Sequence, residues 1–308
     1  MNGVTLDKTP DGLAVCRFTL APGVQAAFTG RGGGLSQPPY DTLNMGSGSG
    51  DSPGTVARNR ELVATACGLV PGRMVWMRQI HSADVARVPA PEGARTHART
   101  QARATAPAAG AGATAAPPAE PPEPPEPPGQ PGPPGPPEPP GQPGQPGPPE
   151  PRDASFTSVP WLALGVLSAD CPAVLIADPD AQIAGAAHSG RQGTARGVVP
   201  ALVRAMAGAG ADPARMHAVI GPGICGGCYE VPGPMRDEVD AAVPGTGCLT
   251  RAGTPGLDLR AGIAAQLAGL GVHRVRTDSR CTAEDPALYS YRRDGRTGRF
   301  AGLVWLAP

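Results

Sequence analysis

The sequence has few aromatic residues, a single lysine and no long hydrophobic run, and each scarcity excludes something. Phe, Trp and Tyr make up 4% of 308 residues. No segment reaches the roughly 18 consecutive apolar residues that a membrane-spanning helix needs, so we expect no membrane partner. Lys8 is the only lysine among 26 basic residues, which 26 acidic residues balance. The net charge of zero argues against binding to nucleic acid through bulk charge.

The N-terminus also lacks the pattern of a secretion signal. Residues 1–12 contain no basic region followed by an apolar core. The seven cysteines are odd in number and scattered along the chain. Such a distribution favours buried or metal-binding thiols in a reducing compartment over a disulfide framework. The sequence therefore predicts a cytoplasmic protein.

A proline-rich tract interrupts the chain. Of the 41 prolines, 20 fall between Pro117 and Pro151, and residues 121–151 follow a three-residue period. A collagen triple helix requires Gly at every third position, whereas Glu takes that place four times here. We therefore interpret the tract as a polyproline II spacer inside a disordered Ala/Pro/Gly-rich insert over residues 89–157.

The parts on either side, residues 1–88 and 158–308, total about 240 residues, which is enough for one core. Apolar runs predict strands at Ala14–Leu20, Val24–Phe28, Met74–Arg78, Asp84–Val88, Leu162–Leu167, Ala173–Ala177, Ile183–Ala187, His217–Ile220, Arg274–Thr277 and Phe300–Leu306. Helices are predicted at Thr55–Cys67, Thr194–Met206, Pro234–Ala242 and Asp258–Leu270. Strands outnumber helices and alternate with them only in places. This favours a single mixed α/β (α+β) domain, with mixed β-sheets flanked by helices, over the two domains that the length suggests.

His81, Cys171 and His188 each stand where an apolar run ends. Three such residues at strand ends can converge above one edge of a sheet. Two imidazoles and a thiolate form a tetrahedral zinc site whose fourth position is open, which is the catalytic type of site. Zinc held there would lower the pKa of a bound water to roughly 7.

Two other interpretations of the same residues stay open. The three residues match no local metal-binding pattern, because they lie 90 and 17 positions apart. One alternative is that they are two core histidines and a buried cysteine. Alternatively, Cys171 is a nucleophile and His188 or His81 its base. Zinc content separates the metal and nucleophile hypotheses.

Cys225-Gly-Gly-Cys228 forms a CxxC pair within a glycine-rich loop. A zinc ribbon would need a second such pair, and the sequence contains none. A thioredoxin-like site would open a helix after a strand. The pattern therefore favours packing within the loop over a redox or metal-binding role.

Two further segments are suited to binding anions. Residues 28–36 place Arg31 among glycines, and residues 290–295 place Arg292 and Arg293 just before an expected turn. Arginine binds phosphate through two parallel hydrogen bonds. The alternative is that these are turn glycines and solvated arginines. No P-loop and no dinucleotide-binding fingerprint is present.

Ten short motifs, in order along the chain, carry a family resemblance. They are Phe28-Thr-Gly-Arg-Gly-Gly-Gly, Tyr40-Asp-Thr-Leu-Asn44, Asn59-Arg60, Gln79-Ile-His-Ser82, Ala169-Asp-Cys171, His188-Ser-Gly, Gly221-Pro-Gly-Ile224, Cys228-Tyr-Glu-Val231, Cys281-Thr282 and Ser290-Tyr-Arg-Arg-Asp294. Together they resemble the laccase-domain family, also described as multicopper polyphenol oxidase-like, purine nucleoside phosphorylase or peptidoglycan editing factor. The resemblance covers nearly the whole chain outside the insert.

The resemblance implies a fold, a metal site and an activity. The fold is a single-domain mixed α/β fold, and His81, Cys171 and His188 hold a zinc ion, with copper as the alternative ion. Five histidines, one of them in the insert, are too few for a multicopper centre. The implied activities are phosphorolysis of adenosine, inosine and methylthioadenosine, and deamination of adenosine. The partners are then small molecules, namely a nucleoside and phosphate.

Roles for other residues follow from the same resemblance. In deamination, Asp170 is the candidate proton carrier. In phosphorolysis, Arg31 with Arg292 or Arg293 holds phosphate against the ribose while the purine leaves. Asn44 and Arg191 are the candidate substrate-binding residues.

The chain departs from the family after the second histidine. The usual His-Ala-Gly-Trp-Arg-Gly reads His188-Ser-Gly-Arg-Gln-Gly193 here. Gln192 therefore takes the place of the family's arginine, and Arg191 is the candidate to replace it in binding an anion.

Two other functions compete with nucleoside chemistry. Bacterial members of the family are also assigned the removal of wrongly incorporated serine from a peptidoglycan precursor, an amide hydrolysis that the same zinc would serve. The other alternative, from a different class, is a non-catalytic partner-binding protein in which the insert is the functional part.

Overall fold

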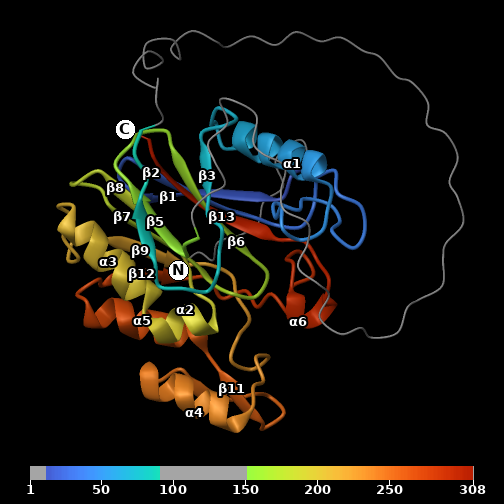
Figure 1. The fold of residues 1–308 in the computed structure, drawn as a ribbon, viewed down its shortest axis with the longest axis vertical. Coiled ribbons are helices and arrows are strands. Elements are labelled where there is room, and N and C mark those ends of the chain that lie inside the picture. The colour runs from blue at the N-terminus through green and yellow to red at the C-terminus, as the bar shows by residue number, and fades with distance from the viewer. Residues whose placement is uncertain (1–11, 91–150, 308) are drawn as a thin grey trace, which may run out of the picture. The chain divides into compact units, whose positions relative to one another are not determined.

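A computed structural model of the chain describes residues 12–90 and 151–307 (Figure 1). Its strands are β1 (Val15–Ala21), β2 (Val24–Thr29), β3 (Met74–Trp76), β4 (Val85–Arg87), β5 (Ala154–Thr157), β6 (Ala163–Ser168), β7 (Ala173–Asp178), β8 (Ile183–His188), β9 (His217–Ile220), β10 (Gly247–Leu249), β11 (Pro255–Leu257), β12 (Arg274–Thr277) and β13 (Phe300–Leu306). Its helices are α1 (Pro53–Ala66), α2 (Arg191–Arg196), α3 (Val198–Gly208), α4 (Gly233–Ala242), α5 (Leu259–Gly269) and α6 (Tyr291–Asp294). They build a single mixed α+β domain, as predicted.

Two mixed sheets form the centre of the domain. One has five strands in the order β1-β2-β13-β6-β3, and the other has six in the order β12-β9-β7-β8-β5-β4. The sheets pack against each other through apolar side chains from both, including Phe28 of β2, Leu164 of β6 and Leu175 of β7. Strands β7 and β8 are buried along their whole length, which is expected where both faces of a sheet are covered.

Helices cover the outer faces of both sheets. Helix α1 packs on the five-stranded sheet through Val63 and Ala64, and α3 and α5 pack on the six-stranded sheet through residues such as Leu202 and Ile263. The two groups of helices lie on opposite sides of the strands in Figure 1. The core is therefore layered as helix, sheet, sheet and helices.

The predicted strands all appear, with ends that differ by one or two residues. The predicted N-cap of α5 is also present, since the Asp258 carboxylate accepts hydrogen bonds from the backbone N–H groups of Arg260 and Ala261. These elements were predictable because their apolar periods coincide with the buried faces.

Two local predictions need correction. The single helix predicted at 194–206 is two helices, α2 and α3, separated by Gly197 with φ of 78°. The insert boundary at residue 157 is wrong, because Ala154–Thr157 forms β5 between β4 and β8. Strands β10 and β11 and helix α6 were not predicted.

Among the described residues, no helix is long and apolar enough to cross a membrane. Residues 91–150 lie outside the described residues, as do residues 1–11. The predicted insert over residues 89–157 falls largely in the first of these ranges.

Candidate metal centre

His81, Cys171 and His188 come together at one end of the two sheets. Their ligand atoms all lie within 4.8 Å of one another. His81 lies in the loop after β3, Cys171 lies between β6 and β7, and His188 is the last residue of β8. Because β6 belongs to the five-stranded sheet and β7 to the six-stranded one, the cluster forms where the chain passes from one sheet to the other.

The backbone around the cluster explains how residues so far apart in sequence meet. The antiparallel register of β7 and β8 pairs Ala173 with His188, which places the start of β7 beside the end of β8. His81 has φ of 61° and Asp170 has φ of 102°. Non-glycine residues rarely adopt such positive φ values, and they concentrate at functional sites.

Asp153 fixes the orientation of the His188 ring. Its fully buried carboxylate lies 2.8 Å from His188 Nδ1 and accepts hydrogen bonds from the backbone N–H groups of Ile80 (3.0 Å) and Ser82 (2.6 Å). These contacts hold the pKa of Asp153 well below its usual range, against the opposing effect of burial. A carboxylate on one ring nitrogen leaves the other, Nε2, as the metal ligand. Asp153 was not predicted as a site residue because it falls within the insert predicted over residues 89–157.

The Cys171 thiol and the His188 ring shift each other's protonation. Burial raises the pKa of Cys171, but the His188 and His81 rings outweigh it and lower that pKa to about 6. Burial likewise lowers the pKa of His188, but Cys171 and Asp153 raise it to about 9. Each of the two groups thus favours the charged form of the other. Metal ions bind the thiolate form of cysteine and the neutral form of histidine.

The cluster is tightly bounded on one side and open on another. A Cβ atom at Gly190 would lie 2.7 Å from Cys171 Sγ and 3.1 Å from His81 Cδ2, so only glycine leaves space there. His188 is 4% exposed, whereas His81 lies on the surface. Three protein ligands with one accessible side match the open type of site, in which the fourth position is free for water or substrate.

Asp170 lies beside the cluster but has its carboxylate engaged. Its Oδ1 accepts hydrogen bonds from the hydroxyls of Thr282 (2.6 Å) and Ser290 (2.7 Å), and its Oδ2 accepts one from the backbone N–H of Arg292 (2.7 Å). Asp170 therefore connects the segment after β12 to the chain next to Cys171. Its predicted role as a proton carrier stays a prediction.

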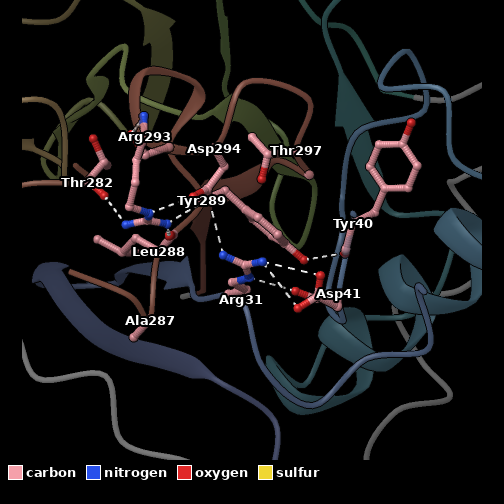
Figure 2. Close-up of polar contacts among 12 residues, drawn as sticks. Arg31, Tyr40, Asp41, Thr282, Ala287, Leu288, Tyr289, Arg293, Asp294 and Thr297 are labelled. Carbon is pink, nitrogen blue, oxygen red and sulfur yellow. Dashed lines mark hydrogen bonds and ion pairs between the residues drawn. The ribbon is translucent and has the colours of Figure 1, made fainter. Parts of the chain in front are cut away.

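Arg31 and Arg293 are engaged in contacts within the fold (Figure 2). The Arg31 guanidinium lies 3.2 Å from a carboxylate oxygen of Asp41 and 3.2 Å from one of Asp294. Arg293 also pairs with Asp294, and it donates to the carbonyl of Leu288. Both charges are thus balanced by carboxylates of the chain, and the predicted phosphate-binding roles of these two arginines stay predictions.

Arg191 and Arg292 lie together around Tyr229. The Arg292 guanidinium lies 5.1 Å from the centre of the Tyr229 ring. Burial and the nearby Cys171 raise the pKa of Tyr229, while Arg191 and Arg292 oppose this shift. These two arginines therefore bring positive charge close to the metal cluster.

Arg299 is a charged residue near the cluster that was not among the predicted site residues. Burial lowers its pKa, and the charges of Cys171 and Asp170 oppose the shift. The sequence signal was an arginine immediately before the wholly buried strand β13. Its backbone N–H donates to Asn44 Oδ1.

Asn44, predicted to bind substrate, is fully buried and organises a loop. Its side-chain N–H groups donate to Ser49 Oγ (2.8 Å) and Asp51 Oδ2 (2.9 Å), and its Oδ1 accepts from the backbone N–H groups of Gly46 and Arg299. A substrate contact by Asn44 stays a prediction.

A hollow of about 280 Å³ lies between α2 and α4. Its lining includes Arg191, Arg196 and Glu238. Arg196 links the hollow to the metal cluster, because it donates a hydrogen bond of 2.9 Å to the His81 carbonyl.

Comparison with known proteins identifies the family. The model of the family described as multi-copper polyphenol oxidoreductase laccase matches residues 25–120 and 132–307. The chain belongs to this family. A relative from Streptomyces coelicolor named purine nucleoside phosphorylase is 45% identical over 284 residues, covering 92% of this chain and 96% of that protein. A relative from Escherichia coli, purine nucleoside phosphorylase YfiH, is 29% identical and covers 96% of this chain and 98% of its own length.

Solved structures share the fold. A Neisseria meningitidis protein described as a member of family DUF152 aligns with a TM-score of 0.69 and 29% identity, covering 94% of this chain and 96% of its own. YlmD from Geobacillus stearothermophilus aligns with a TM-score of 0.74 over 100% of both chains, and its 24% identity bears on the fold alone. The family assignment and the predicted mixed α+β fold are thus confirmed.

Proposed function

We propose that this protein is a zinc-dependent purine nucleoside phosphorylase that also deaminates adenosine. The observation that carries the proposal is the cluster of His81, Cys171 and His188, whose ligand atoms lie within 4.8 Å of one another. Arg191 and Arg292 lie nearby, around Tyr229. The names of the family relatives support it, since they describe purine nucleoside phosphorylases.

The cluster fits a zinc ion on the chemistry of its ligands. Cys171 supplies a thiolate, and Asp153 holds His188 so that Nε2 is free to bind. His81 closes the set from the exposed side. When bound, zinc would supply Lewis acidity at neutral pH in a site with one open position.

Arg191 and Arg292 are the residues that we assign to phosphate. Both lie by Tyr229, whereas Arg31 and Arg293 are paired with Asp294. Guanidinium groups bind phosphate through two parallel hydrogen bonds and stabilise its charge. In phosphorolysis, a phosphate oxygen forms a bond to ribose C1′ while the bond from C1′ to the purine nitrogen breaks, and the base takes up a proton. The arginines would hold the phosphate for this attack.

Asp170 belongs to the deamination part of the proposal. Three donors, from Thr282, Ser290 and Arg292, hold its carboxylate at the edge of the cluster. To carry a proton, this carboxylate would have to exchange one of those donors for the substrate amino group.

Product analysis tests the proposal. Zinc-loaded protein should release free base from adenosine, inosine or methylthioadenosine only when phosphate is present, and it should convert adenosine to inosine without phosphate. Cys171→Ala should lose both activities and the zinc of this site. Cys248→Ala is the matched control, because Cys248 lies outside the cluster.

Three outcomes would contradict the proposal. Fully zinc-loaded protein that neither releases base nor deaminates would exclude the nucleoside activities. Release of serine from a peptidoglycan precursor by that same protein would favour the amidase alternative. Activity that persists in the metal-free protein but disappears in Cys171→Ala would favour Cys171 as a nucleophile.

A further inference from the structure

A second group of metal-binding side chains lies outside the cluster of His81, Cys171 and His188. Cys225, Cys228, Cys281 and Glu284 each offer one ligand atom, and these four atoms lie within 4.8 Å of one another. The two groups share no residue. The second group does not enter the proposed nucleoside chemistry, and the inference drawn from it does not depend on that function.

The four residues stand on two facing turns. Cys225 and Cys228, with two residues between them, lie on a turn in which the backbone N–H of Cys228 donates to the carbonyl of Cys225 at 2.9 Å. Cys281 and Glu284 have the same spacing on a second turn, with Glu284 N–H donating to the Cys281 carbonyl at 3.1 Å. A β-bridge between Gly223 and Cys281 holds the two turns together. The backbone thus places a CxxC pair opposite a CxxE pair.

Paired ligands on two turns are the arrangement of a closed structural zinc site. Tetrahedral zinc with bonds of about 2.3 Å to sulfur separates its ligand atoms by about 3.8 Å, so side chains already within 4.8 Å need only small rotations. Three cysteines select a thiophilic ion such as zinc over magnesium or calcium. Four protein ligands leave no open position, so the ion would be structural, unlike an ion in the first cluster.

The surroundings of the second cluster suit several thiolates gathered in one place. Arg251 Nη1 lies 3.0 Å from Cys228 Sγ and contacts the Glu284 carboxylate, and the backbone N–H of Cys225 donates to Cys281 Sγ at 3.3 Å. Three thiolates and one carboxylate carry four negative charges, of which a zinc ion neutralises two. The Arg251 guanidinium offsets part of the remainder from outside the ligand set.

We propose that Cys225, Cys228, Cys281 and Glu284 form a second, structural zinc site. The ion would join the loop after β9 to the loop after β12. The second loop continues to Thr282 and Ser290, whose hydroxyls hold the Asp170 carboxylate. The second zinc would therefore stabilise the loop that holds Asp170 beside the first cluster, without contacting that cluster.

Metal stoichiometry tests the proposal. Full-length protein is loaded with zinc under reducing conditions and desalted, and zinc per chain is measured by mass spectrometry. We expect two zinc ions in the unchanged protein, one in Cys171→Ala, one in Cys228→Ser and none in the double variant. Cys248→Ser is the control and should keep two, since Cys248 Sγ is close to the Gly226 carbonyl but not among the four ligands.

Cobalt provides a measurement that does not depend on Cys228→Ser folding. In cobalt-loaded Cys171→Ala, only the second site contains thiolates, so strong thiolate-to-cobalt charge-transfer absorption should remain. The proposal is overturned if that absorption is missing, or if Cys171→Ala retains no zinc. It is also overturned if peptide mapping finds a Cys225–Cys228 disulfide in place of a second zinc. If the unchanged protein binds one zinc in total, and that zinc is retained by Cys171→Ala and lost by Cys228→Ser, the second site is upheld and the first is contradicted.

Discussion

At the scale of single residues, the cluster of His81, Cys171 and His188 depends on two features that are not ligands. One is the Asp153 carboxylate, which holds His188 Nδ1 at 2.8 Å. The other is the missing side chain of Gly190, which leaves room for Cys171 Sγ. Each can be altered without removing a ligand.

Asp153→Asn should lower zinc affinity by about 10- to 100-fold, the range typical for partners of metal-bound histidines. The asparagine oxygen can still accept from Ile80 and Ser82, and its NH₂ group would then face His188 Nδ1. The ring would have to carry its proton on Nε2, the atom needed for the metal. Competition with a chelator of known affinity measures the change. Asp84→Asn, at an exposed position in the same region, should leave the affinity unchanged.

Gly190→Ala should weaken metal binding at least tenfold while changing the unfolding temperature of the metal-free protein little. The new methyl group would displace Cys171 Sγ and His81 Cδ2, which are mobile ends of side chains rather than backbone. Gly208→Ala is the control, because no atom lies within 4 Å of a Cβ built there. Equal zinc affinities for the two variants would show that Gly190 is not required for the site.

At the scale of elements, buried polar contacts join strands to distant loops. The apolar periodicity of the strands does not predict these contacts. Asp178 ends β7 and is fully buried. Its carboxylate accepts hydrogen bonds from the backbone N–H groups of Asp180, Ala181 and Asp212 and pairs with Arg215. It thereby connects β7 to the loop between α3 and β9.

Asp178→Asn should lower the free energy of unfolding by about 1–3 kcal/mol at neutral pH. Burial raises the pKa of Asp178, but the hydrogen bonds and Arg215 outweigh it and lower that pKa. A lowered folded-state pKa gives stability that is present above the unfolded value of about 3.9 and is lost as pH falls below it. Urea unfolding at several pH values should therefore show the difference between the two proteins shrinking below about pH 4. If the difference in free energy of unfolding between the two proteins does not change with pH, the ionised form of Asp178 is not what stabilises the fold.

The two helices α2 and α3 show where periodicity misleads. The apolar residues Val198, Leu202 and Met206 are buried as a helical period predicts. Gly197 nevertheless separates α3 from α2, because its φ of 78° ends one helix before the next begins. A single glycine in an apolar pattern is compatible with both outcomes, so the break could not be predicted from spacing.

At the scale of the whole molecule, the strands and the first cluster were predictable and the connections around them were not. His81, Cys171 and His188 were selected because each follows an apolar run, and strand ends meet at sheet edges. Asp153 was missed because it follows the proline tract without an apolar period of its own. The CxxE pair was missed because Glu284 is not a cysteine and lies 56 residues from Cys228. Contacts between loops distant in sequence leave no local pattern.

The parallel pairing of β4 with β5 sets a lower limit on the chain between them. Val85 pairs with Ala154 and Arg87 with Phe156, so the connection leaves one end of the sheet and must return to the other. Parallel neighbours need about a dozen residues or more for such a return, whereas a hairpin needs about two. Replacing residues 92–148 with a Gly/Ser linker of about 15 residues should preserve zinc content and unfolding temperature. Joining Pro89 directly to Arg152 leaves only Val88, Pro89, Arg152 and Asp153 between β4 and β5, so this variant should lose both the zinc and cooperative unfolding. The pairing of these two strands therefore sets a minimum length for the segment between them and no maximum.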